Sequence, residues 1–239
     1  MGYFGAEPEP VVDVLQHIPL TGLEPNAVLA VNCNGDMIDL AGDAVFDQNP
    51  SFVGYLANGS YDGLRDVLDL GQWIGTTTAA AHRVPTASAI TYGLFLFTEY
   101  TQTANPFPLY SGIGTTSSTR NYGFKIDPGN GGPYEPIPGG PAFPDPTIGI
   151  YNKWVHIMIT EPAGRATAKL YVNGVFRSSV TSGQPGVMSA SDEFWLGSAK
   201  NQTNTFLNGY CESVFVADAE YTEAQIRQLA ENAFGHVLP

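Results

Sequence analysis

The chain has 239 residues, of which 43% are hydrophobic and only 14% are charged, and its formal net charge is −13. A chain of this length buries about 70% of the surface that its unfolded form exposes, so it can build a core without disulfides or metals. The negative charge repels phosphate backbones and anionic lipid surfaces, which argues against nucleic acid and the membrane as partners.

The charge is unevenly distributed. No Lys or Arg precedes Arg65, whereas nine acidic residues do. This acidic region has two interpretations: it keeps the protein soluble, or it forms a docking face for a basic partner or a cation. The 27 glycines and 18 prolines indicate many turns between short strands.

The N-terminus is expected to form an extended arm over residues 1–12, followed by one domain over 13–239. Pro8 and Pro10 disfavour a helix, and Tyr3 and Phe4 are apolar residues without a periodic context. These aromatic side chains are predicted to dock, either on their own domain or on a partner subunit. The segment lacks the basic and apolar regions of a signal peptide, and no apolar run in the chain has the length of a membrane helix.

Short strands are predicted through the first half of the chain. The apolar run 27–33 ends at the turn pair Asn34-Gly35, and 36–46 continues in strand-like fashion. Residues 62–75 fit either a helical turn or an irregular strand. Residues 90–99, ITYGLFLFTE, form a strong strand that is apolar on both faces, and shorter strands follow at 107–113 and 121–126.

A loop with seven prolines and six glycines is predicted at 127–149. No regular structure is expected there, and a loop of this length inside a compact domain usually has a function. Its apolar residues Tyr134, Ile137 and Phe143 indicate an ordered insertion that covers a sheet or contacts a neighbour. The alternative is a passive linker.

The second half contains the clearest hairpin. Residues 153–160 alternate, with Trp154, His156, Met158 and Thr160 on one face and Val155, Ile157 and Ile159 on the other. Strands at 167–172 and 175–180 flank the turn pair Asn173-Gly174. Further strands are expected at 193–198 and 206–216.

One helix is predicted at the C-terminus. Thr222 and Gln225 form a capping box, and Gly235 ends the helix. The apolar stripe of this helix is expected to pack against a sheet edge or the rim of a sandwich; it comprises Ile226, Leu229, Ala230 and Ala233.

Five segments resemble, in order and spacing, the second half of a laminin-G-like, concanavalin-type jelly roll: KWVH at 153–156, KLYVNG at 169–174, FWLGS at 194–198, FLNGYCESV at 206–214 and YTEAQI at 221–226. The strand at 90–99 corresponds to the one that usually follows the family's opening segment. The resemblance implies an all-β fold, a two-sheet antiparallel β-sandwich with one short C-terminal helix. A departure is Cys211-Glu212, which stands where the family commonly has an acidic pair.

The resemblance also allows for catalysis, because some relatives are glycoside hydrolases. These enzymes use two carboxylates, which in this fold family lie on one strand. Glu212 and Asp218 do not reproduce that arrangement, and Glu212 is predicted to be a carboxylate at a strand end or rim. No histidine pair has a metal-type spacing, and His156 is interpreted as a hydrogen-bonded histidine of the sheet. We therefore expect a protein that is not an enzyme.

No cofactor is predicted, although the family sometimes binds glycans or proteins through calcium. The acidic and amide candidates for calcium, interpreted as solvated loop residues, are Asp36, Asp39, Asp43, Asp47, Asp127 and Asn130. Cys33 and Cys211 are interpreted as two buried thiols, and a disulfide between them is the alternative, since the first and last strands of this fold type can be neighbours.

These observations favour a structural or binding protein of a particle. The opening Met-Gly-Tyr-Phe-Gly looks like the start of some phage structural proteins. We expect a bacteriophage virion component assembled in the host cytoplasm, as capsid decoration or tail protein. Its partners would be other virion proteins or copies of itself in a homo-oligomer, and its surface could contact host glycans. The alternatives are a free carbohydrate-binding or adhesion module and, third, a glycoside hydrolase.

Overall fold

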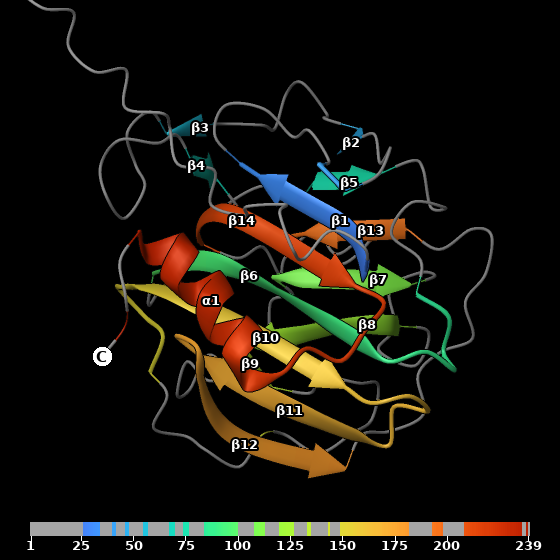
Figure 1. Cartoon of the computed structure of the whole chain (residues 1–239). Coiled ribbons are helices and arrows are strands. Elements are labelled where there is room, and N and C mark those ends of the chain that lie inside the picture. The colour runs from blue at the N-terminus through green and yellow to red at the C-terminus, as the bar shows by residue number, and fades with distance from the viewer. Residues whose placement is uncertain are drawn as a thin grey trace, which may run out of the picture.

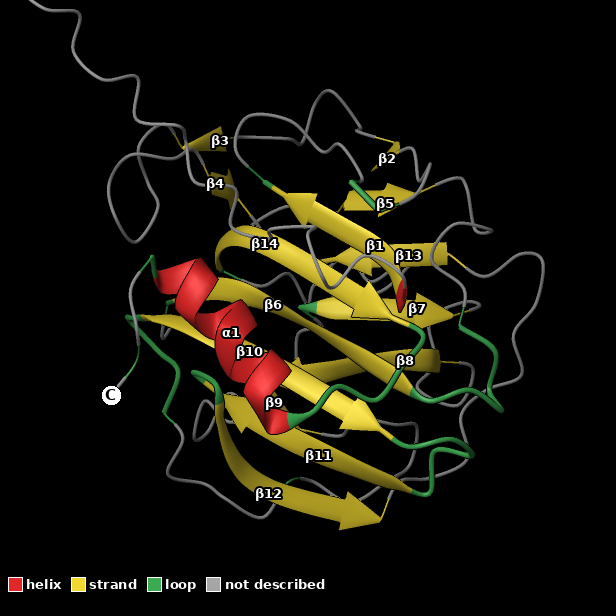
Figure 2. Cartoon of the chain, in the orientation of Figure 1, coloured by secondary structure: helices red, strands yellow, loops and turns green. Residues whose placement is uncertain are grey.

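The computed structural model describes residues 26–33, 40–41, 46–47, 55–56, 67–69, 74–76, 84–99, 108–112, 120–126, 133–134, 143, 149–181, 193–197, 208–235 and 238. These residues form two antiparallel sheets and one helix (Figures 1 and 2). The predicted arm over residues 1–12 lies outside the described residues.

The larger sheet has eight strands. In spatial order they are β12 (Val175–Thr181), β11 (Thr167–Val172), β10 (Trp154–Glu161), β6 (Ile90–Thr98), β14 (Gly209–Ala217), β4 (Val67–Asp69) and β3 (Tyr55–Leu56), and β1 (Ala27–Asn32) also pairs with β14. The longest strands, β6 and β14, lie next to each other, so the centre of this sheet joins the two halves of the sequence.

The smaller sheet has six strands. In order they are β2 (Phe46–Asp47), β5 (Ile74–Thr76), β13 (Glu193–Leu196), β7 (Leu109–Gly112), β8 (Arg120–Ile126) and β9 (Pro133–Tyr134). The all-β fold and the strands predicted at 90–99, 121–126 and 167–172 are confirmed. Where the sequence left a helical turn or a strand open at 62–75, the structure has two short strands, β4 and β5.

The hairpin of β11 and β12 is formed as predicted. Asn173 and Gly174 have φ values of 52° and 76°. Two successive residues with positive φ define the turn that matches the twist of a two-residue hairpin. Gly174 is required for a second reason, because a Cβ atom there would lie 2.9 Å from Cα of Arg227 in the helix.

The main core lies between the two sheets. Val155, Ile157 and Ile159 of β10 point into it, as the alternation predicts. The facing side chains from the smaller sheet include Tyr122 and Phe124. All of these residues are almost fully buried, so the space between the sheets is a packed interior.

Helix α1 (Glu223–Phe234) lies across the outer face of the larger sheet (Figure 1). Its Ile226 and Leu229 pack in one cluster with Met158 and Phe215, and its Phe234 contacts Phe95 with ring centroids 4.9 Å apart. The expectation that the helix packs on an edge or rim is therefore wrong. The central strands carry large apolar side chains on both faces, and the second face needs a cover.

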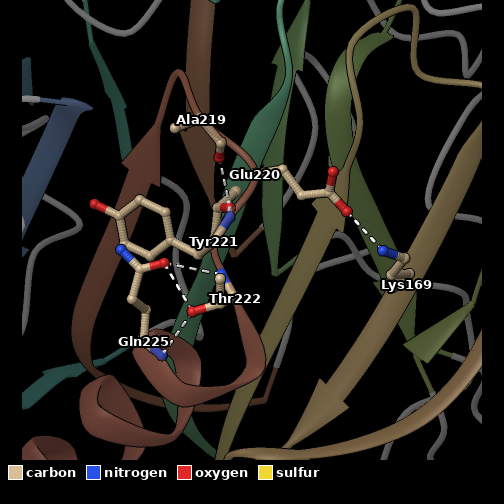
Figure 3. Close-up of polar contacts among 7 residues, drawn as sticks. Lys169, Ala219, Glu220, Tyr221, Thr222 and Gln225 are labelled. Carbon is tan, nitrogen blue, oxygen red and sulfur yellow. Dashed lines mark hydrogen bonds and ion pairs between the residues drawn. The ribbon is translucent and has the colours of Figure 1, made fainter.

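The start of the helix is fixed by the predicted capping box (Figure 3). The backbone N–H of Gln225 donates to Oγ1 of Thr222, and the backbone N–H of Thr222 donates to Oε1 of Gln225. Just before the cap, Oγ1 of Thr91 on β6 donates to the carbonyl of Ala219 and accepts from the N–H of Tyr221. The turn into the helix is therefore tied to the centre of the sheet.

Arg165 closes one end of the sandwich. It lies in the turn between β10 and β11, its φ is 47°, and it is only 1% exposed. Its guanidinium donates to the carbonyl oxygens of Val84, Pro85 and Ser88 and to both the carbonyl and the side-chain oxygen of Asn121. One side chain thus connects the larger sheet, the smaller sheet and the segment before β6.

The charge of Arg165 is balanced inside the protein. Burial lowers the pKa of its guanidinium, and the nearby Glu161, Tyr92 and Tyr122 oppose that shift. The Tyr92 hydroxyl donates to Oε1 of Glu161 at 3.0 Å. A planar donor group with several acceptors is the form of buried cation that a protein interior tolerates.

Replacing Arg165 tests this role. Arg165→Met removes the donors and takes the Arg165 charge away from the buried Glu161 carboxylate. We therefore expect a loss of about 3–5 kcal/mol in the free energy of unfolding, measured by urea denaturation. The matched control is Arg177→Met on β12, where the arginine is exposed, with an expected change within about 0.5 kcal/mol. Equal losses of unfolding free energy in the two variants would contradict the structural role of Arg165.

Candidate functional site

The candidate binding face is the outer face of the smaller sheet, since α1 covers that of the larger one. Phe194 and Leu196 of β13 point into the core and are fully buried. Residues alternate along a strand, so Trp195 between them belongs to the outer face.

Trp195 is part of a row that crosses this sheet. It pairs in register with Gly75 of β5 and Tyr110 of β7, and Tyr110 pairs with Gly123 of β8. We call these four positions the aromatic row. Gly75 and Gly123 add no side chain at the two ends of the row, and Trp195 is buried, with 8% of its surface exposed. An aromatic ring with one polar N–H suits a ligand that has both apolar faces and hydroxyl groups.

The residues predicted to contact a partner are placed as follows. Tyr3, Phe4 and Ile137 lie outside the described residues. Tyr134 is the second residue of β9 and pairs with Lys125 of β8, at the end of the smaller sheet. Phe143 is 6% exposed and packs in the main core.

The burial of Phe143 bears on the loop at 127–149. A core side chain within the loop fits the interpretation in which the insertion covers a sheet. In this structure the Phe143 ring is packed within its own chain, so it does not offer the surface expected of a partner contact. The contacts predicted for Tyr134 and Ile137 stay predictions.

Glu212 is not a rim carboxylate, contrary to the expectation. It is 1% exposed and lies at a bulge of β14, where the register to β6 shifts between Cys211 and Ser213. The carbonyl of Glu212 accepts a hydrogen bond from the N–H of Cys33 at 2.8 Å. An extra residue in one strand redirects side chains, and an alternating sequence pattern does not reveal it.

Within the part of the chain that the structure describes, no three His, Cys, Asp or Glu side chains form a group that could hold a metal. The acidic candidates for calcium fall outside it, except Asp47, of which only the backbone is described. Cys33 and Cys211 are both buried, and the structure has no disulfide between them. They lie near each other across β1 and β14, and Sγ of Cys211 donates to the carbonyl of Ser213 at 3.4 Å.

His156 is buried on the outer face of the larger sheet. It pairs with Phe95 across β10 and β6, and its Nδ1 has no hydrogen-bond partner among the described residues. The interpretation as a hydrogen-bonded histidine is therefore wrong for this atom. Burial lowers the pKa of His156 from 6.5 to about 3. The ring is neutral at physiological pH and acts as an apolar packing group.

The buried His156 makes stability depend on pH. Between the unfolded pKa of 6.5 and the folded pKa of about 3, the unfolded chain binds the extra proton, so stability falls as the pH falls through this window. We expect a loss of about 3 kcal/mol between about pH 7 and pH 4 from this group. In urea denaturation, His156→Leu should make the free energy of unfolding depend less on pH between about pH 7 and pH 4. An unchanged pH dependence would contradict the lowered pKa of His156.

Comparison with known proteins identifies related folds. The model of the concanavalin A-like lectin/glucanases superfamily matches residues 72–227. No curated protein matches the sequence. Among the described residues, no helix combines the length and the apolar character needed to cross a membrane.

Of three similar solved structures, two are named as binding domains and one is a complex with arabinotriose. The binding domain of Paraclostridial Mosquitocidal Protein 1 has a TM-score of 0.62 at 12% identity, with 87% of this chain and 52% of that one covered. A second structure is domain 4 of AbnA, an extracellular arabinanase from Geobacillus stearothermophilus, in complex with arabinotriose. Its TM-score is 0.59 at 16% identity, with 86% of this chain and 98% of that one covered. The receptor binding domain of a botulinum neurotoxin C/D mosaic serotype has a TM-score of 0.60 at 14% identity, covering 90% and 55%.

These identities establish likeness of fold alone. The chain spans about half of the two toxin domains and nearly all of the arabinanase domain. The shared architecture is the sandwich itself, on which many different sites can be built.

Proposed function

We propose that this chain, which belongs to the concanavalin A-like lectin/glucanases superfamily, is a non-catalytic binding module. The observation that carries the proposal is the division of its two outer faces. The larger sheet is covered by α1, whereas the register of the smaller sheet brings the positions of the aromatic row together, with Trp195 on the side away from the core. Two solved structures of similar fold are named as binding domains, and a third, a domain of an arabinanase, is in complex with arabinotriose.

We further propose that the module works in a bacteriophage virion, as capsid decoration or tail protein. Two features support a docking role. The N-terminal segment has aromatic residues, Tyr3 and Phe4, ahead of two prolines. Within 127–149, Phe143 packs in the core and Tyr134 belongs to the last strand of the smaller sheet.

Purified native particles test the virion role. Quantitative mass spectrometry should find this chain at a fixed copy number per particle. Deleting residues 1–12 should abolish attachment while the thermal unfolding of the isolated protein stays unchanged, because the arm precedes the first described strand, β1. Normal attachment of the truncated protein would exclude a role for the arm, and absence of the chain from particles would exclude the virion role.

A free carbohydrate-binding module is the second candidate, favoured by the aromatic row. A glycan array with the full chain should show binding that is lost in Trp195→Leu, because stacking on an aromatic ring contributes about 1–2 kcal/mol in comparable contacts. The matched control is Trp154→Leu, on the larger sheet near Phe95 and Phe97. Binding that survives Trp195→Leu would exclude the row as the sugar site, and repeating the array with a chelator tests calcium.

A further inference from the structure

Strand β12 is the terminal strand of the larger sheet on the side away from β1. It carries Val175 and Phe176, each 42% exposed, and these are the exposed large hydrophobic residues of the described chain. Figure 1 shows β12 at the outer limit of the sheet, next to β11, with which it forms a hairpin. An edge of this kind presents unpaired backbone groups together with apolar side chains.

The edge strand is only lightly protected against pairing. It contains no proline, and its one charged residue is Arg177. Arg177 is exposed and lies at the bulge where the register between β11 and β12 shifts. We call Val175, Phe176 and Arg177 the edge patch.

The edge patch is also the basic part of an acidic protein. Residues 162–191 contain three basic residues and no Asp or Glu, although the whole chain has a net charge of −13. Of these three, Arg165 is buried, and Lys169 is engaged by Glu220 at 2.6 Å (Figure 3). Arg177 is therefore the cation of this segment that can meet a partner.

We propose that the edge patch binds the N-terminal arm, residues 1–12, of a second copy of this chain, which adds to β12 as a further strand. The arm has the complementary charge, because Glu7 and Glu9 are its only charged side chains. Tyr3 and Phe4 supply apolar groups for the exposed Phe176. The inference deepens the proposed function, in which the arm docks on a neighbouring subunit.

The spacing of the arm's prolines suits this pairing. Successive N–H groups of a strand point to opposite sides, so Pro8 and Pro10 both lack an N–H on the same side. The other side, with the N–H groups of Glu7, Glu9 and Val11, keeps its donors for β12. Prolines are tolerated only in such an outermost strand. The two carboxylates also share one face, on which Arg177 can meet them.

A second copy is favoured by the topology. The arm precedes β1 in the chain, and β1 pairs with β14. Strands β6, β10 and β11 lie between β14 and β12. The first described strand after the arm, β1, is thus separated from the accepting edge by β14, β6, β10 and β11. Such a contact joins two different segments of the chain, so it closes as a dimer when the exchange is reciprocal and otherwise produces chains or rings of subunits.

Sedimentation velocity of the full chain tests the proposal. We expect self-association at about 50 mM salt that weakens at about 500 mM, because the pairing of Arg177 with carboxylates is screened. Arg177→Glu and Phe176→Ser should each weaken association about tenfold or more. Lys153→Glu is the matched control: it makes the same change of charge at an exposed lysine outside β12 and should leave association as in the wild type.

A charge exchange identifies the occupant. The double variant Glu7→Arg/Glu9→Arg has an altered arm and an intact edge patch. The variant Arg177→Glu has an intact arm and an altered edge patch. Each should associate poorly alone, and a mixture of the two should associate again. Failure of the mixture, or a monomeric wild type at all concentrations, overturns the inference, including the case in which the arm folds onto its own chain. Self-association of a chain that is absent from particles would sink the virion role and leave this inference standing.

Discussion

The structure depends on a sheet that is apolar on both faces. In the central strands β6, β10 and β14, one set of alternate residues faces the smaller sheet and the other set includes Phe95, Met158 and Phe215. A sheet of this kind is stable only when both faces are removed from water. The smaller sheet covers one face, and α1 covers the other. This explains why the helix of 12 residues lies across the central strands of the larger sheet.

The same constraint explains the buried polar groups. His156 belongs to the face beneath the helix, where it remains neutral. Arg165, by contrast, closes an end of the sandwich, where its guanidinium donates to the backbone carbonyls of Val84, Pro85 and Ser88. A long planar cation can reach several acceptors from one turn, and a shorter residue could not connect the two sheets there.

Local features of the fold were predictable from the sequence, and tertiary ones were not. The capping box of Thr222 and Gln225 and the Asn173-Gly174 turn depend on residues close in the chain, and both are formed. The position of α1 depends on which face of a strand far away in the sequence is exposed to water. The apolar stripe of the helix therefore predicted that the helix is partly buried, but not which surface it covers. The bulge at Glu212 depends on the register between β14 and β6, which alternation in one strand does not encode. The aromatic row became apparent only from the register of the smaller sheet, because its four positions lie on four different strands.

The distribution of cover and charge decides where the protein can meet other molecules. Because α1 occupies the outer face of the larger sheet, the surfaces left to consider are the outer face of the smaller sheet and the sheet edges. The edge of β12 combines apolar side chains with Arg177 in a chain whose first 64 residues are acidic without a basic residue. Copies with a net charge of −13 repel each other over most of their surfaces, so any association between them must be concentrated where that charge is locally reversed.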